Sequence, residues 1–349
     1  MRLGVNLGYL TGPDAAAAAG DALALARAAE DAGCDSAWVA EAYGSDAVSV
    51  LGWLAAQTSR IALGSAVLQV PARAPAATAM AAATLDALSG GRFRLGLGVS
   101  GPQVSEGWYG QRFAAPLART REHVAVVREV LARRPLRFEG EHVRLPLPDG
   151  PGVPLRLALP ARADLPVYLA AVGPRNVALA GEVADGWLPV FLAPEACGEQ
   201  FAALAAGRAR RTAPQPARGF DVCASVPVLL TGATGAARRE AEAPVRRHVA
   251  LYLGGMGSRS QNFYADLARR LGFSDAVDEV QETFLAGDHR AAAAAVPDGF
   301  LEATCLVGPA GTLRARLDDY ARAGVSTLAL APLAPALPER VATVRALAG

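Results

Sequence analysis

A cluster of glycines near position 98 has the clearest potential for chemistry. Residues 88–101 read Leu-Ser-Gly-Gly-Arg-Phe-Arg-Leu-Gly-Leu-Gly-Val-Ser-Gly. Gly96, Gly98 and Gly101 match the pattern G-x-G-x-x-G, which in dinucleotide-binding folds opens a helix directly after the first strand. A nicotinamide dehydrogenase is therefore one hypothesis for this chain.

The context of the pattern argues against that hypothesis. The run 93–99 is the fourth strand-like segment, and we expect a loop after Gly101 with no clean helix before about residue 118. Glu122 stands at about the distance of a ribose-binding acid, but it falls inside that helix. Glycines that let a strand end pack closely against its loop or a ligand explain the pattern at least as well.

Ionisable and aromatic residues follow two other predicted strands. Glu41 comes directly after an apolar strand, and its partner could be a ring N–H, a hydroxyl group or an arginine. A structural ion pair and a catalytic role are equally compatible with this position. Tyr43 and Tyr109 lie in loops that follow strands. We predict Glu41, Tyr43 and Tyr109 as candidate proton donors, with water as a further alternative and Glu41 preferred.

Small residues gather after three further strands, where the backbone can approach a flat ring and point N–H groups at a phosphate. Gly173-Pro174 stands directly before a predicted helix, a position suited to an anion. An ordinary turn has the same composition. The predicted cofactor-binding residues, with Asn6 from the first strand, are Asn6, Glu41, Gly64, Ser65, Ala66, Val67, Gln69, Gly98, Val99, Ser100, Gly101, Ser105, Ala170, Ala171, Val172, Gly173 and Pro174.

The elements that must position these residues alternate along the chain. Repeated joints, Ala32-Gly33-Cys34 and Ala323-Gly324-Val325, each end a helix at glycine before an apolar strand. This repetition favours a closed (β/α)8 TIM barrel over an open sheet. We predict strands at 2–8, 35–41, 60–69, 93–99, 166–171, 186–191, 220–230 and 325–331, and helices at 14–32, 45–58, 75–88, 118–133, 174–184, 195–211, 235–253 and 311–323.

Two segments interrupt the alternation. Residues 134–165 are proline-rich and contain a possible hairpin at 136–145, and residues 254–300 are helical but out of register. We expect both to be insertions in a single barrel domain spanning 1–349. Lids or subunit contacts are equally possible roles.

Composition excludes several classes of function. All 34 basic residues are arginine, so the chain has no Schiff-base, catalytic or Walker A lysine. The net charge of +1 gives no field that favours nucleic acids or membranes. The four cysteines and four histidines show no metal-ligand spacing, so we expect no metal. Reduced thiols and the absence of a signal peptide predict a cytoplasmic protein.

With these residues in view, the chain resembles the luciferase-like flavin and deazaflavin oxidoreductases, in particular their coenzyme F420-dependent subgroup. The resemblance rests on Leu88-Ser89-Gly90-Gly91-Arg92 before Leu95-Gly96-Leu97-Gly98, on Gly64-Ser65-Ala66-Val67, and on Ala170-Ala171-Val172-Gly173-Pro174. Tyr252-Leu253-Gly254-Gly255-Met256-Gly257, Asn262-Phe263-Tyr264 and Leu306-Val307-Gly308-Pro309 match as well. The resemblance covers nearly the whole chain.

The resemblance implies a TIM barrel that holds a deazaflavin ring at its strand ends, backed by a non-prolyl cis peptide at Ala66-Val67. It implies phosphate and tail contacts at Gly98 to Gly101 and at Val172 to Pro174. Sugar-phosphate dehydrogenases of this group place His beside the acid at position 41 and use Lys for phosphate; here the neighbour is Ala42 and Lys is absent. A sugar phosphate is therefore not the expected substrate.

The implied activity is hydride transfer between deazaflavin C5 and a C=C, C=N or C=O carbon of a small molecule, by a homodimer as in relatives. An FMN-dependent monooxygenase on the same barrel is the main alternative. The nicotinamide dehydrogenase is weaker, and a non-catalytic cofactor carrier is a third possibility.

Overall fold

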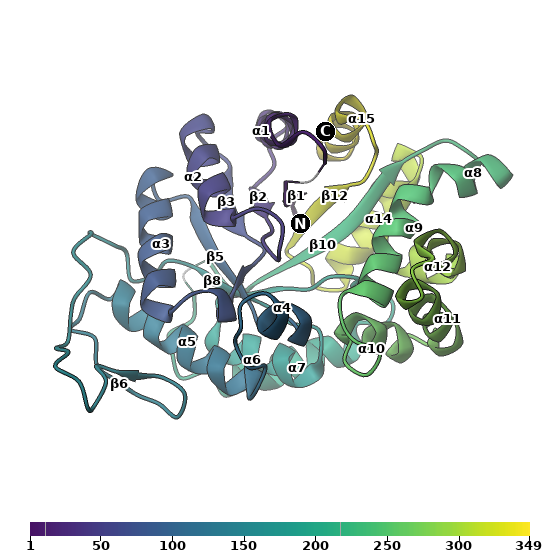
Figure 1. Cartoon of the computed structure of the whole chain (residues 1–349). Helices are drawn as coiled ribbons and strands as arrows, with labels where there is room; N and C mark the ends of the chain where they lie inside the picture. Colours follow the sequence, from purple (N-terminus) through teal and green to yellow (C-terminus); the bar gives the residue numbers. More distant parts are fainter. Residues whose placement is uncertain (11, 217) are drawn as a thin grey trace.

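The computed structural model describes residues 1–10, 12–216 and 218–349, and its parallel strands form a closed barrel surrounded by helices (Figure 1). The barrel closes because β10 pairs with both β9 and β12, and β12 in turn pairs with β1. The predicted TIM barrel is thus confirmed. Within the described residues, the eight strands of the barrel are β1 (Arg2–Gly8), β2 (Ser36–Val39), β3 (Ala62–Ser65), β5 (Phe93–Gly98), β8 (Val167–Ala170), β9 (Gly186–Leu188), β10 (Asp221–Leu230) and β12 (Thr327–Pro332).

Aromatic side chains fill the interior of the barrel. Trp38 and Tyr168 meet edge to face, with ring centroids 5.2 Å apart. Gly64 makes room for this pair, since a Cβ atom there would lie 2.3 Å from the indole of Trp38. The barrel is therefore a packed core below its carboxyl end, and a ligand site can form only above these rings.

The surrounding helices follow the strands in alternation, as the sequence predicted. Gly33 and Gly324, at the repeated joints, have φ of 78° and 99°, the left-handed conformation that favours glycine. The outer helices are α1 (Ala15–Asp31), α2 (Ala47–Gln57), α3 (Pro75–Leu88), α5 (Pro116–Leu131), α6 (Pro174–Val183), α7 (Gly198–Ala209), α14 (Ala310–Arg322) and α15 (Leu337–Ala348).

The first insertion contains the predicted hairpin. Strands β6 (Phe138–Glu139) and β7 (Arg144–Leu145) pair antiparallel. The carboxylate of Glu122, on α5, accepts hydrogen bonds from the backbone N–H groups of residues 141, 142 and 143 at 2.8–2.9 Å. Glu122 therefore anchors the hairpin. Because its carboxylate is used in these hydrogen bonds, it is not available to bind a ribose.

The second insertion, 254–300, packs together with the region 235–253 into a helical layer whose core includes Phe191, Val249 and Phe300. The expected single helix at 235–253 is wrong, because the chain breaks at Glu242 and then widens into a π-helix. The segments are α8 (Gly235–Ala241), α9 (Ala243–Ala250), the π-helix η2 (Leu251–Gly255), α10 (Phe263–Arg270), α11 (Ser274–Leu285), α12 (His289–Ala295) and α13 (Asp298–Thr304).

Several short elements differ from the predictions. The segment after Gly101 is not a loop: α4 (Pro102–Gly107) starts directly there, with proline in its first turn. The predicted strand 60–69 is interrupted, with β3 ending at Ser65, β4 covering Leu68–Gln69 and the 3-10 helix η1 covering Val70–Ala72. Strand β11 (Leu306–Gly308), which extends the edge of β10, and helix α15 were not predicted.

In the described ranges, none of the helices combines the length and apolar composition needed to cross a bilayer.

Candidate active site

A cavity of about 840 Å³ opens at the carboxyl ends of the strands, where TIM barrels carry their active sites. Its walls come from the loops after β1, β2, β5 and β8 and from the second insertion. The structure brings these predicted residues together in its lining: Glu41, Tyr43, Ala66, Val67, Gln69, Gly98, Val99, Ser100, Gly101, Ala170, Ala171, Val172, Gly173 and Pro174.

Two further predicted residues, Gly64 and Ser65, lie below the cavity inside the barrel wall. Gly64 is pressed against Trp38, as described above. The hydroxyl of Ser65 donates to the carbonyl of Gly96 at 2.8 Å and accepts from its N–H at 2.9 Å. Direct contact with a cofactor is not supported for either residue, because both are committed to strand packing.

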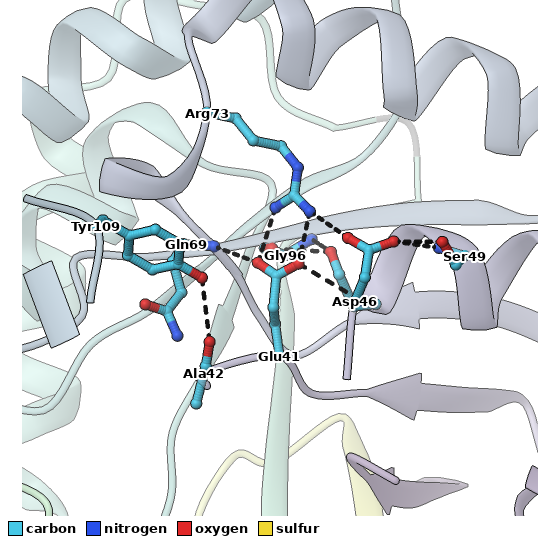
Figure 2. A network of polar contacts seen from close by, with 10 residues as sticks. Glu41, Ala42, Asp46, Ser49, Gln69, Arg73, Gly96 and Tyr109 are labelled. Atoms are coloured by element: carbon cyan, nitrogen blue, oxygen red, sulfur yellow. Dashed lines mark hydrogen bonds and ion pairs between the residues drawn. The ribbon is translucent and has the colours of Figure 1, made fainter. Parts of the chain in front are cut away.

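Asn6, Ser105 and Tyr109 are also absent from the lining, and each has a partner within the protein. The Asn6 amide donates to Ser225 Oγ at 2.8 Å, and Ser105 Oγ donates to the carbonyl of Gln111 at 2.7 Å. The Tyr109 hydroxyl donates to the carbonyl of Ala42 at 3.1 Å (Figure 2). The geometry therefore favours structural roles at these three positions.

The floor of the cavity is formed by Ala66, Val67, Gly98 and Ala170. The peptide bond between Ala66 and Val67 is cis, at the position that the family resemblance implied. Gly98 lies against Val67, since a Cβ atom at Gly98 would come within 2.5 Å of Val67 Cγ2. The same Cβ would lie 3.8 Å from Ala170. The Val67 side chain occupies the space that a side chain at Gly98 would need, so small apolar groups form this part of the lining.

Glu41 is fixed in a dense ion-pair network at the edge of the cavity (Figure 2). Its carboxylate is 5% exposed and receives both terminal nitrogens of Arg73, at 2.8 and 2.7 Å. Arg73 also contacts Asp46, which caps α2. The hydrogen bonds with Glu41 raise the pKa of Arg73 above its usual value. Of the partners considered for Glu41, an arginine is the one observed.

Two buried amide oxygens in the lining have no protein partner among the described residues. They are Gln69 Oε1 and Asn176 Oδ1. A buried acceptor without a donor costs stability, so a bound ligand that supplies N–H or O–H groups would be favoured there. Asn176 was not among the predicted residues.

The start of helix α6 provides an open, electropositive position in the same cavity. Gly173 caps the helix, and a Cβ atom at Gly173 would meet nothing within 4 Å. Arg175 follows in the first turn and also lines the cavity. The free N–H groups of a helix start and a guanidinium group together suit a phosphate.

Three tyrosines, which sequence reasoning did not identify as part of the site, form another wall of the cavity. It consists of Tyr9 after β1, Tyr252 in η2 and Tyr264 in α10. The rings of Tyr252 and Tyr264 pack edge to face, with centroids 4.8 Å apart. Burial raises the pKa of Tyr264 to about 12 and, with Tyr264 and Tyr9 nearby, raises that of Tyr252 as well. All three phenols are therefore neutral hydrogen-bond donors at pH 7.

With this geometry established, comparison with known proteins identifies the family. The model of the luciferase-like monooxygenase family matches residues 1–327. The chain belongs to this family. It is 46% identical, over 94% of both chains, to a Mycobacterium tuberculosis protein provisionally named coenzyme F420-dependent oxidoreductase Rv3520c.

Two archaeal proteins extend the comparison. A 5,10-methylenetetrahydromethanopterin reductase of Archaeoglobus fulgidus is 30% identical over 88% of both chains. The solved structure of a coenzyme F420-dependent tetrahydromethanopterin reductase from Methanopyrus kandleri superposes with a TM-score of 0.81, covering 99% of this chain and 97% of that one at 23% identity. The second similarity shows a shared fold.

Proposed function

We propose that this protein is a coenzyme F420-dependent oxidoreductase that transfers a hydride between the cofactor and a carbon of a small organic substrate. The lining of the cavity carries the proposal, because it combines small apolar residues, which leave room for a flat ring, with the start of α6 at Gly173, which suits a phosphate. The name of the Mycobacterium tuberculosis relative, which is aligned over 94% of both chains, favours F420 over FMN.

The residues of the cavity fit this cofactor. The ring would lie on the floor, and the unpartnered oxygens of Gln69 and Asn176 would accept hydrogen bonds from its N–H or hydroxyl groups. Gly173, Pro174 and Arg175 would hold the phosphate at the start of α6. When bound, the deazaflavin supplies hydride transfer at C5, and the protein supplies orientation and exclusion of water.

Glu41 has a positioning role in this proposal. Both of its oxygens accept from Arg73, so the carboxylate is an acceptor that fixes the end of β2 beside the floor. Tyr109 is held by Ala42, and Tyr43 is 51% exposed. These positions make all three weaker candidates for the proton donor than the sequence suggested.

An FMN-dependent monooxygenase is the second candidate, and the name of the family favours it. The floor would accept either ring. The nicotinamide alternative is disfavoured because α4 has only six residues and Glu122 is occupied by the hairpin. A homodimer in the cytoplasm stays a prediction.

Parallel titrations test the proposal. The purified protein is mixed separately with oxidised coenzyme F420, FMN and NADPH, and fluorescence reports binding. We expect tight binding of F420 and weak binding of the other two. Tight binding of FMN without F420 would replace the proposal with the monooxygenase. Binding of F420 without turnover of enones, imines and ketones would support a carrier.

A further inference from the structure

Three phenol groups converge on the cavity from distant parts of the chain. Tyr9, Tyr252 and Tyr264 all line it, and no hydrogen bond joins their hydroxyls to another protein group in the described ranges. The rings of Tyr252 and Tyr264 lie edge to face with centroids 4.8 Å apart, so their hydroxyl groups belong to one part of the lining. Unpaired donors at a cavity surface are available to a ligand.

The surrounding residues hold these rings in place. The side chain of Asn262 donates to the carbonyls of Tyr252 and Leu253, at 2.9 and 2.8 Å, and accepts from the N–H of Tyr264 at 2.9 Å. Asn262 therefore connects η2 to the first turn of α10. Gly44 lies against the ring of Tyr9, since a Cβ atom there would be 2.4 Å from Cδ2.

The environment behind Tyr252 is uncharged. Phe191 packs edge to face against it, with ring centroids 5.2 Å apart, and His248 lies at 4.8 Å. Burial lowers the pKa of His248 to about 4, so this ring is neutral at pH 7. The rings of Phe191 and His248, which pack against Tyr252, therefore carry no charge at pH 7.

We propose that Tyr252, supported by Tyr9 and Tyr264, forms the hydrogen-bond donor site for the oxygen of an uncharged carbonyl substrate. The inference rests on the proposed function and narrows it to a substrate class, a ketone or enone. Tyr252 would be a catalytic residue because its hydroxyl touches the reacting group.

The charges of the cavity support an uncharged substrate. Among the described residues that line it, the only ionised side chains are Glu41, which is paired with Arg73, and Arg175, at the start of α6. Val190, Met256 and Phe263, which are apolar, line the same cavity as the three tyrosines. A carboxylate or phosphate near Tyr252 would have no cation to compensate its desolvation.

Reduction of a ketone at this site requires one hydride donor, reduced F420, and one proton donor, a tyrosine phenol. In the direction of reduction, the carbonyl carbon gains a hydride and its electron pair from reduced F420, and the C=O π electrons move to oxygen. That oxygen takes the proton of a phenol, and the product is an alcohol. Water returns a proton to the phenolate. For an enone reduced at its β-carbon, the same donor protonates the enolate.

Equilibrium binding to the protein loaded with oxidised F420 tests the site without turnover. The probes are cyclohex-2-en-1-one and acetophenone, with cyclohexene as a hydrocarbon control, and ligand-observed NMR gives Kd. The variant Tyr252→Phe keeps the ring packing. We expect it to weaken ketone binding about fivefold, as for the loss of one hydrogen bond, and to leave cyclohexene binding unchanged. In infrared spectra of the Tyr252→Phe complex, the carbonyl stretch of the bound ketone should lie closer to its value in an apolar solvent than it does in the wild-type complex.

The outcomes separate the two proposals. Tyr252→Phe should bind F420 as the wild type does, and failure of the wild type to bind F420 would overturn the proposed function. If F420 binds but neither ketone binds the wild type, or if Tyr252→Phe binds ketones equally well with an unchanged carbonyl stretch, the tyrosine site is wrong. Tyr264→Phe and Tyr9→Phe should have smaller effects of the same sign.

Discussion

Arg73 holds both carboxylate oxygens of Glu41, at 2.8 and 2.7 Å, and so joins the end of β2 to the segment that follows the cavity floor. Glu41 is 5% exposed, and Arg73 is its charged partner, while the backbone N–H groups of Ala47 and Gln69 donate to it at 3.4 Å. The ion pair therefore holds these two segments together at the edge of the cavity.

Removing one partner of this pair should cost stability. We expect Arg73→Ala to lower the free energy of unfolding by about 2 kcal/mol, because it leaves a buried carboxylate unpaired. Urea denaturation measures this loss. The double variant Glu41→Gln/Arg73→Ala should be more stable than the sum of the single effects predicts. Strict additivity would show that the two side chains are not coupled.

A side chain at Gly98 should interfere with the floor. In Gly98→Ala the new methyl would approach Val67 Cγ2, a stiff β-branched group, to 2.5 Å, and relief requires movement of the floor. We expect affinity for F420 to fall about tenfold, or about 1.4 kcal/mol. The control is Gly107→Ala in α4, where a Cβ atom would meet nothing within 4 Å. Equal affinities for the two variants would remove Gly98 from the floor.

The proposed phosphate site at the start of α6 can be tested by introducing a negative charge there. Gly173→Asp should fold well, because there is room for the side chain and Asp favours the position that caps a helix. Its carboxylate would repel a phosphate, and we expect affinity for F420 to fall at least about tenfold. Gly173→Asn has the same size without the charge and should bind much more tightly than Gly173→Asp. Similar affinities for both, independent of salt, would place the phosphate elsewhere.

Buried histidines should make the fold sensitive to acid. Burial lowers the pKa of both His123 and His248 to about 4, below the ordinary value of 6.5. Between these values the unfolded chain binds more protons, so stability must decrease as pH falls from 6.5 toward 4. Each histidine should contribute about 1 kcal/mol per pH unit between pH 6 and 5.

Urea denaturation across that interval measures the slope. His248→Phe, which keeps an aromatic ring beside Tyr252, should reduce it by about that amount relative to the wild type. An unchanged slope would mean that His248 is protonated in the folded protein.

The repeated βα joints predicted the barrel, because each one encodes a local helix end followed by a buried strand. The small residues at 66–67, 98–101 and 170–174 predicted the cavity floor for a similar reason: in a parallel barrel the strand ends must meet at one face. The repeated joints thus predicted the barrel, and the composition of the strand ends predicted which residues line the cavity.

Other features depend on contacts that local patterns do not contain. Tyr9, Tyr252 and Tyr264 meet only after the second insertion folds back over the barrel, so no spacing reveals them. The partner of Glu41 lies 32 residues away. In contrast, Pro102 after Gly101 was a usable signal for α4, since proline favours the first helical turn.

A crystal structure of the complex with oxidised coenzyme F420 tests the central claim most directly. We predict a deazaflavin ring lying on Val67, Gly98 and Ala170, with its phosphate at Gly173. A ring bound away from this floor, or a phosphate gripped by the start of α4 as in a dinucleotide fold, would contradict it.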